Sequence, residues 1–217
     1  MTTTPRIALI HALAHSVEPI NAEFERAWPE AIRMNLLDDS LSADLARQGR
    51  GLDAVMHQRF ETLAAYAEGT GAQAILFTCS AFGPCIEAAA ARRPHMPVLK
   101  PNEAMIADVA SVAGPVGLIA SFAPTLASMP AEFPASVELK TGLVAQAMDA
   151  LNRGDTAAHD ALVVQAARQL ADQGCQAIAL AQFSMARAAP AVTQMTGLPV
   201  FTTPGSAVRL LRRRLSA

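Results

Sequence analysis

The sequence contains no uninterrupted apolar run that approaches the roughly 18 residues needed for a membrane-spanning helix. Charged residues are scarce, at 17% of the chain, and the formal net charge of −2 argues against a nucleic-acid partner. The one basic run, residues 209–214, ends a predicted helix, where it complements the helix dipole. A hydrophobic fraction of 52% over 217 residues excludes a disordered chain and provides enough apolar side chains for a core.

Cysteines are also few. Cys79, Cys85 and Cys175 form an odd set without CxxC pairs, which argues against both a disulfide framework and a metal site. The first residues hold one arginine and a short apolar segment interrupted by His11, so they do not resemble a signal peptide. These absences predict a cytoplasmic protein without a metal, a membrane anchor or a nucleic-acid partner.

Short apolar runs alternate with longer helical patterns along the whole chain. The runs are continuous, as expected for parallel strands that are buried on both faces. They predict strands at residues 6–10, 31–37, 73–78, 97–99, 115–120, 136–140 and 176–180. Helices are predicted at residues 17–28, 41–69 with a break near 49–51, 83–93, 102–112, 155–173 and 203–215. This order predicts an α/β fold, with parallel sheets flanked by helices.

The second half of the chain repeats the order of the first. Residues 71–75 match residues 174–178 at an offset of 103, and residues 96–98 match 198–200 at an offset of 102. Residues 6–10 match 115–119 at an offset of 109. The matches predict two pseudo-symmetric lobes, residues 1–97 with about 203–217 and residues 98–202. Two such lobes would place their strand ends across one cleft, where a ligand site is expected.

Small polar residues follow the third predicted strand of each half. Thr78, Cys79 and Ser80 end the first of these strands, and the offset of 103 equates Cys79 with Gln182 in the second. The carboxyl ends of the strands in an open α/β sheet are where ligands bind. The helix that follows such a strand presents free N–H groups at its start, which attract a carboxylate and favour a thiolate.

The position of Cys79 therefore predicts a reactive thiol, although a small buried hydrophobe is the alternative. Cys85 falls within the next helical pattern, and Cys175 precedes a strand, so both are predicted to pack in the core.

Other side chains follow the predicted strands at the same edge. His11 either relays a proton or is a histidine whose hydrogen bonds are satisfied at a strand end. Ser121 either caps the next helix or binds a carboxylate, and Lys100 either pairs with an acidic substrate or is solvated. Phe82 and Phe183 are candidates for contacting an apolar or aromatic substituent.

The segment 75–81, Ile-Leu-Phe-Thr-Cys-Ser-Ala, resembles the first-cysteine motif of the aspartate/glutamate/hydantoin racemase superfamily. That superfamily includes maleate isomerases and arylmalonate decarboxylases. The segment 180–186, Leu-Ala-Gln-Phe-Ser-Met-Ala, resembles the second-cysteine motif, with Gln182 in the place of the cysteine. The resemblance implies two α/β lobes with the active site in the cleft between them, a small carboxylate substrate, no cofactor and a homodimer.

Gln182 departs from the two-cysteine pattern, and an amide cannot exchange a proton at neutral pH. The prediction is therefore a cofactor-independent isomerase or decarboxylase-like lyase that uses one cysteine to transfer a proton next to a carboxylate. The alternatives are an isomerase or hydrolase with Cys79 as nucleophile and His11 as its base, or a carboxylate-binding protein without turnover. The predicted catalytic residues are Cys79, Gln182 and His11, and the predicted substrate contacts are Thr78, Ser80, Ala81, Ser121, Phe183, Ser184 and Lys100.

Overall fold

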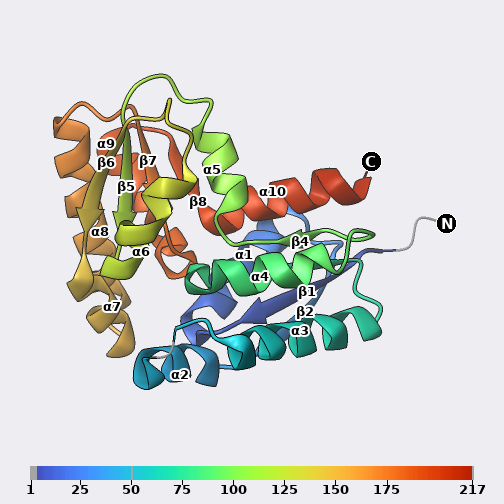
Figure 1. The fold of residues 1–217 in the computed structure, drawn as a ribbon. Helices are drawn as coiled ribbons and strands as arrows, with labels where there is room; N and C mark the ends of the chain where they lie inside the picture. Colours follow the sequence, from blue (N-terminus) through green and yellow to red (C-terminus); the bar gives the residue numbers. More distant parts are fainter. Residues whose placement is uncertain (1–3, 50, 217) are drawn as a thin grey trace. The chain divides into compact units, whose positions relative to one another are not determined.

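A computed structural model of the chain describes residues 4–49 and 51–216. The chain divides into two compact units, Met1–Pro101 with Ala207–Ala217 and Asn102–Ser206. Each unit contains one four-stranded parallel sheet, and the colours in Figure 1 show that each half of the sequence builds one of them. Residues 1–3, used above in the signal-peptide argument, and Arg50, within the predicted helix break, lie outside the described residues.

The first unit has the strand order β2-β1-β3-β4. Its strands are β1 (Arg6–His11), β2 (Ile32–Leu37), β3 (Ala74–Phe77) and β4 (Val98–Leu99). Its helices are α1 (Val17–Ala27), α2 (Ser40–Gln48), α3 (Ala54–Gly69) and α4 (Gly83–Ala91), with short 3₁₀ turns η1 (Ala14–Ser16) and η2 (Ser80–Phe82). The predicted break in the long helical segment is confirmed, since α2 ends at Gln48 and the next residue, Gly49, has a left-handed φ of 60°.

The core of the first unit explains its continuous apolar strands. Ile10 and Phe77 face helices α3 and α4 within one buried cluster. There the ring of Phe60 lies 5.3 Å from that of Phe77 and 4.9 Å from that of Phe82. Leu9, which points to the opposite face of the sheet, also has no exposed surface. Both faces of the sheet are therefore covered, as the apolar runs predicted.

The second unit has the strand order β6-β5-β7-β8. Its strands are β5 (Val116–Ala120), β6 (Leu139–Leu143), β7 (Ala177–Leu180) and β8 (Val200–Thr202). Its helices are α5 (Glu103–Val109), α6 (Ala123–Ser128), α7 (Ala145–Asn152), α8 (Thr156–Asp172) and α9 (Ala189–Thr196), with 3₁₀ turns η3 (Met129–Glu132) and η4 (Phe183–Ala188). The last helix, α10 (Thr203–Ser216), follows β8.

Helices cover both faces of this sheet as well. Helices α7, α8 and α9 share one buried cluster with Ile119 and Leu180, and α5 shares another with Leu118. Gly117 lets α8 approach the sheet closely, because a Cβ atom there would lie 2.9 Å from Cδ1 of Leu170. The α/β fold with two helix-flanked parallel sheets is as predicted.

The strand register matches the sequence repeat. In the first sheet Ile7 of β1 pairs with Ala74 of β3, and in the second Val116 of β5 pairs with Ala177 of β7. The offsets of 109 and 103 equate these two pairs residue for residue. The same strand order in both sheets agrees with this correspondence.

The last strand of each sheet leads into a helix of the other unit. Helix α5 follows β4 but belongs to the second unit, and α10 follows β8 but from Ala207 onward belongs to the first. The chain therefore passes between the units twice.

Several parts of the second half differ from the prediction. The strand predicted at residues 136–140 lies at Leu139–Leu143, because the N–H of Val137 donates to the carbonyl of Pro134 at 2.9 Å and closes a turn there. Helices α7 and α9 and the strand β8 have no counterpart among the predicted elements. The two helices have only eight residues each and the strand only three, so they give a weak periodic signal.

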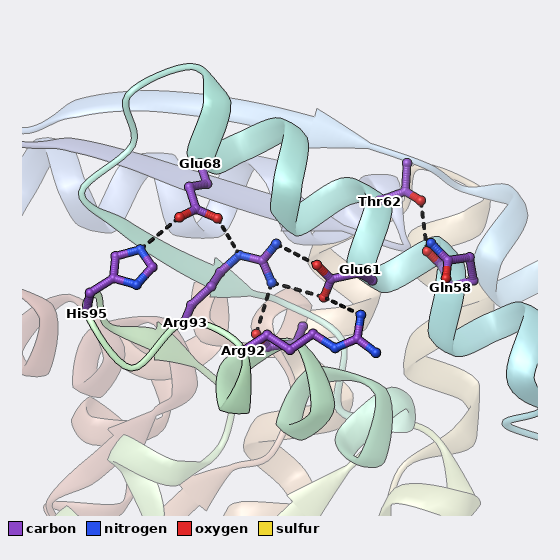
Figure 2. A network of polar contacts seen from close by, with 8 residues as sticks. Gln58, Glu61, Thr62, Glu68, Arg92, Arg93 and His95 are labelled. Carbon is purple, nitrogen blue, oxygen red and sulfur yellow. Dashed lines mark hydrogen bonds and ion pairs between the residues drawn. The ribbon is translucent and has the colours of Figure 1, made fainter.

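A buried arginine joins α3 to the end of α4 (Figure 2). The guanidinium of Arg93, whose side chain is 4% exposed, donates to Glu61 at 2.8 and 3.0 Å, to Glu68 at 3.0 Å and to the carbonyl of Ala89 at 3.0 Å. The pKa of Glu61 is lowered, mainly by its hydrogen bond from Arg93. This network links α3 to the residues that follow α4.

None of the helices in the described part of the chain combines the length and apolar character needed to cross a membrane. Within residues 4–49 and 51–216, no three His, Cys, Asp or Glu side chains are arranged to hold a metal ion.

Candidate functional site

Cys79 lies in an extended segment between the end of β3 and the turn η2. The side chain is half-buried, and the hydroxyl of Ser42 in α2 and the backbone N–H of Ala81 hydrogen-bond to its sulfur. The preceding residue, Thr78, is fixed by a hydrogen bond from its backbone N–H to the carbonyl of Ile10 in β1, at 3.0 Å. The thiol is thus fixed at the carboxyl edge of the first sheet, where the sequence predicts it.

The ionisation of this thiol differs from the prediction. Burial raises the pKa of Cys79, and the hydrogen bonds from Ala81 and Ser42 offset this only in part. A helix amino terminus was expected to favour thiolate, but α4 begins only at Gly83, beyond the turn η2. Desolvation therefore dominates, and Cys79 is a protonated thiol at neutral pH.

Alkylation of Cys79 by iodoacetamide should accordingly be slow near neutral pH. Its rate should rise about tenfold per pH unit between about pH 7 and pH 9, because only the thiolate reacts. Cys79 should still react before Cys85 and Cys175, which are 1% and 2% exposed, and burial raises the pKa of Cys85 to about 11. Mass-spectrometric mapping over this pH range measures all three rates, and a flat profile for Cys79 would contradict the assignment.

His11, the last residue of β1, is fully buried and uses both ring nitrogens. Its Nδ1 lies 2.9 Å from the hydroxyl of Thr78, and its Nε2 lies 3.0 Å from Oδ1 of Asn35. Asn35 Oδ1 can only accept, so Nε2 carries the proton and Nδ1 accepts from Thr78. Burial lowers the pKa of His11 more than the Asn35 hydrogen bond raises it, so the ring is neutral. The second interpretation given above, a histidine satisfied at a strand end, fits this geometry.

A small hollow connects His11 with the thiol. It is too narrow to hold a water molecule and is lined by Ile10, His11, Ala12, Leu41, Phe60, Phe77 and Cys79. The inner side of Cys79 therefore faces mainly apolar side chains, which is the physical cause of its raised pKa.

Gln182 lies at the carboxyl edge of the second sheet, two residues beyond Leu180, the last residue of β7. Its Oε1 accepts two hydrogen bonds from Ser121, one from the backbone N–H at 2.6 Å and one from the hydroxyl at 2.9 Å. A backbone N–H can only donate, so the amide oxygen must face Ser121. The two hydrogens on Nε2 are consequently directed away from Ser121, and Gln182 presents donors only.

Cys79 and Gln182 occupy equivalent backbone positions in their units. Each directly precedes a 3₁₀ turn, with φ and ψ of −124° and 118° for Cys79 and −130° and 145° for Gln182. The equivalence deduced from the repeat is thus present in the local geometry of both loops.

The other predicted contacts fall into different environments. Ser80 is half-buried and Ala81 is exposed beside the thiol, whereas the side chain of Ser184 is 4% exposed. Lys100 forms an ion pair with Glu87 at 2.6 Å. Phe82 and Phe183 are 0% and 2% exposed, so both rings belong to the core and neither is presented to a substituent.

Sequence reasoning missed Ser42, Asn35 and Asn21. Ser42 contacts the thiol from a helix that follows another strand, and Asn21 Nδ2 donates to Asn35 Oδ1 at 2.9 Å to extend the chain of hydrogen bonds behind His11. No motif marks these residues. A general signal exists for Ser42, since it lies just beyond the carboxyl end of β2, at the same edge as Cys79.

Comparison with known proteins places these features in context. The family model described as Asp/Glu/Hydantoin racemase matches residues 14–211. No curated protein matches the sequence significantly.

Several solved structures share the fold. A glutamate racemase from Bacillus anthracis has 16% sequence identity and a TM-score of 0.74, with 100% of this chain and 83% of that chain covered. An allantoin racemase from Klebsiella pneumoniae has 18% identity and a TM-score of 0.68, with coverage of 98% and 88%. The sulfate-associated form of a mutant arylmalonate decarboxylase has 20% identity and a TM-score of 0.67, with coverage of 98% and 94%.

Proposed function

Because the chain belongs to the Asp/Glu/hydantoin racemase family, we propose that it transfers a proton at the carbon next to a carboxylate of a small acid, with Cys79 as its single acid–base residue. The family and its structural neighbours comprise racemases and a decarboxylase, so the enzyme is an isomerase or a decarboxylase-like lyase. The proposal adds that it works without a cofactor, with Cys79 as the acid–base residue and Gln182 as an anion-binding residue.

The observation that carries the proposal is the pair of hydrogen bonds from Ser121 to Oε1 of Gln182. They fix the amide so that it offers two N–H donors and no group that can take a proton from carbon. A fixed amide donor of this kind binds a carboxylate or stabilises the negative oxygen of an enediolate. The two equivalent positions, one in each unit, therefore hold one titratable residue and one anion-binding residue.

The protonated thiol of Cys79 suits the delivery of a proton. When a carboxylate leaves as CO₂, the electron pair of the broken carbon–carbon bond remains on the α-carbon and its conjugated oxygen. The S–H proton then moves to that carbon, and the resulting thiolate takes a new proton from water. In the exchange reaction the thiolate removes the α-hydrogen and returns a proton to the same face.

The nucleophilic alternative has less support. It needs a thiolate and a base, whereas burial raises the pKa of Cys79 and the ring nitrogens of His11 are engaged with Thr78 and Asn35. Delivery of a proton from the protonated thiol to a decarboxylated intermediate requires neither a thiolate nor a second base.

The test follows deuterium and chirality together. In deuterium oxide the enzyme should exchange the α-hydrogen of its substrate while retaining configuration, or it should release CO₂ and form one enantiomer of the labelled product. Interconversion of both enantiomers at comparable rates would contradict a single acid–base residue.

Replacing Gln182 with glutamate tests the anion-binding role. Gln182→Glu keeps an oxygen for Ser121 but removes both N–H donors, and we expect KM to rise by about tenfold or more, because hydrogen bonds to charged groups are worth roughly 1.5–3 kcal/mol. Gln176→Glu is the matched control, since Gln176 is exposed at the opposite end of β7. Equal effects of the two substitutions on KM would argue against the role of Gln182.

The proposal also includes a cytoplasmic homodimer that needs no nucleic acid. The three free cysteines support a cytoplasmic location. The formal net charge of −2 supports the absence of a nucleic-acid partner, and the family resemblance supports the dimer.

A further inference from the structure

The turn η4, which directly follows Gln182, is long for its type. It keeps 3₁₀ geometry over six residues, whereas the equivalent turn after Cys79, η2, has only three. Runs of 3₁₀ helix longer than about three or four residues are uncommon, because their hydrogen bonds are poorly aligned and their side chains eclipse one another. The internal hydrogen bonds of η4 therefore hold it weakly, and contacts from other elements have to maintain its conformation.

The backbone of Gln182 is tied to this turn. Its carbonyl accepts a hydrogen bond from the N–H of Met185 at 3.0 Å. The side chains of Phe183 and Met185 anchor the beginning of η4, since both are buried in the second unit. A change in the conformation of η4 would consequently move Gln182, whose amide oxygen has to stay within reach of Ser121.

An ion pair connects the far end of η4 to the beginning of α8. Nε of Arg187 donates to both carboxylate oxygens of Asp160, at 2.9 and 3.3 Å. The two side chains are 34% and 26% exposed, so the pair is partly shielded from solvent. Helix α8 is itself well fixed there, because the side chain of its N-cap, Asp155, accepts from the backbone N–H of Ala158 at 3.0 Å. The ion pair thus links the weakly held turn to a capped helix of 17 residues.

A buried histidine also holds the carboxylate of Asp160. His159 is fully buried, and its Nδ1 lies 2.7 Å from Oδ1 of Asp160. A carboxylate can only accept, so Nδ1 carries the proton. No group in the described part of the chain hydrogen-bonds to the other ring nitrogen, Nε2, and burying an unpartnered polar atom costs free energy. A hydrocarbon ring would fill the same space without this cost, so what the histidine contributes here is its N–H donor to Asp160.

Resting on the proposed function, we propose that Arg187, Asp160 and His159 form a bridge that positions the anion-binding amide. The bridge keeps η4 in its 3₁₀ conformation, so that Oε1 of Gln182 stays on Ser121 and the two N–H donors of the amide keep their direction. The three side chains act through the backbone of η4 rather than on the substrate. Loss of the guanidinium of Arg187 or of the donor of His159 should let η4 relax, and the hydrogen bonds between Ser121 and Gln182 should then open more often.

The backbone N–H of Ser121 reports on the bridge without any ligand, since it donates to Oε1 of Gln182 at 2.6 Å. Its hydrogen exchange, measured by NMR, should be about tenfold faster in Arg187→Met than in the wild type. Arg187→Lys should recover part of the protection, because an ammonium group can still donate to Asp160. Arg168→Met is the matched control and should leave the exchange unchanged, because Arg168 lies in the same helix as Asp160 but is exposed.

Two replacements of the histidine separate its donor from its ring. His159→Asn keeps an N–H donor close to the position of Nδ1, and His159→Phe keeps the ring but removes the donor. At Ser121 the asparagine variant should exchange like the wild type and the phenylalanine variant like Arg187→Met, so this pair decides the question if Arg187→Met does not fold. The N–H of Ile178, which donates to the carbonyl of Pro199 at 2.9 Å in β7, should exchange at one rate in all variants. Equal acceleration at Ile178 and Ser121 would mean general destabilisation and would overturn the proposal.

Malonate, a plain dicarboxylate, tests the link between the bridge and anion binding. Its apparent dissociation constant, obtained from thermal stabilisation, should rise about tenfold in Arg187→Met and in Gln182→Glu. Combining the two substitutions should add little, because both act on the same amide.

Two failures are distinguishable. If the exchange of the Ser121 N–H is the same in Arg187→Met and Arg168→Met, the bridge has no positioning role, whatever malonate does, and the proposed function stands. If this exchange responds as expected but malonate does not bind, or binds equally well to Gln182→Glu, the bridge stands and the anion-binding role of Gln182 in the proposed function fails.

Discussion

Replacing Cys79 with alanine should lower the turnover of any substrate acid by at least about a hundredfold, while the protein keeps its fold. Alanine cannot carry a proton, and the neighbouring groups are poor substitutes: Ser42 carries only a hydroxyl, and both ring nitrogens of the neutral His11 are engaged. The side chain is half-buried beside a narrow hollow, so the loss of one sulfur atom should cost about 1 kcal/mol in unfolding free energy.

The measurement compares kcat and urea unfolding for Cys79→Ala and for Cys175→Ala. Cys175 is 2% exposed in the core of the second unit, so its substitution should change stability without affecting turnover. Activity that survives in Cys79→Ala within about threefold would rule out Cys79 as the acid–base residue, because a positioned acid or base contributes about a hundredfold or more.

Replacing Arg93 with methionine should reduce the free energy of unfolding by about 3 kcal/mol, because it leaves two carboxylates without their buried partner. Figure 2 shows the guanidinium held by Glu61 and Glu68, and it also donates to the carbonyl of Ala89; the Arg93 side chain is only 4% exposed. The neighbouring Arg92 is the control: its side chain is 66% exposed and reaches Glu61 only at 3.7 Å, so Arg92→Met should cost less than about 0.5 kcal/mol.

This stabilisation depends on pH in a defined direction. Arg93 holds the pKa of Glu61 below its unfolded value of 4.5, so the contribution is fully present above that pH and is lost as the pH falls through the lowered folded value. Urea unfolding at several pH values should therefore show the wild type and Arg93→Met converging as the pH falls below 4.5. A difference that stays constant into acid would mean that packing of the long side chain, rather than the ion pair, dominates.

The elements that sequence patterns predict well are those whose signal is local. Continuous apolar runs identify β1, β3, β5 and β7, because both faces of these strands are buried, and the repeat identifies Cys79 and Gln182 as equivalent positions. The strand β6 is displaced because a turn at Pro134 competes with a weak apolar run.

Sequence patterns do not predict which side chains from distant parts of the chain come into contact in the folded protein. The amide of Gln182 is oriented by Ser121, 61 residues away, and the pKa of Cys79 depends on a pocket built from several elements. The same limitation explains why the burial of Phe82 and Phe183 was not predicted. Their positions next to the two key residues suggested contact with a substrate, but their rings turn into the cores of the two units.

The exchange of helices between the units has a consequence for the order in which the protein folds during synthesis. The second unit is one continuous stretch, Asn102–Ser206, so all of its residues are available before residues 207–217 are made. The first unit contains the start of the chain, yet it lacks the part of α10 where Ala207, Val208 and Leu211 are fully buried and Arg212 donates to the carbonyl of Ala27 at 2.8 Å. A nascent chain can thus complete its second unit first. The first unit, although most of it is synthesised earlier, must wait with part of its apolar surface exposed until α10 has been translated, since Arg212 lies 185 residues beyond its partner Ala27.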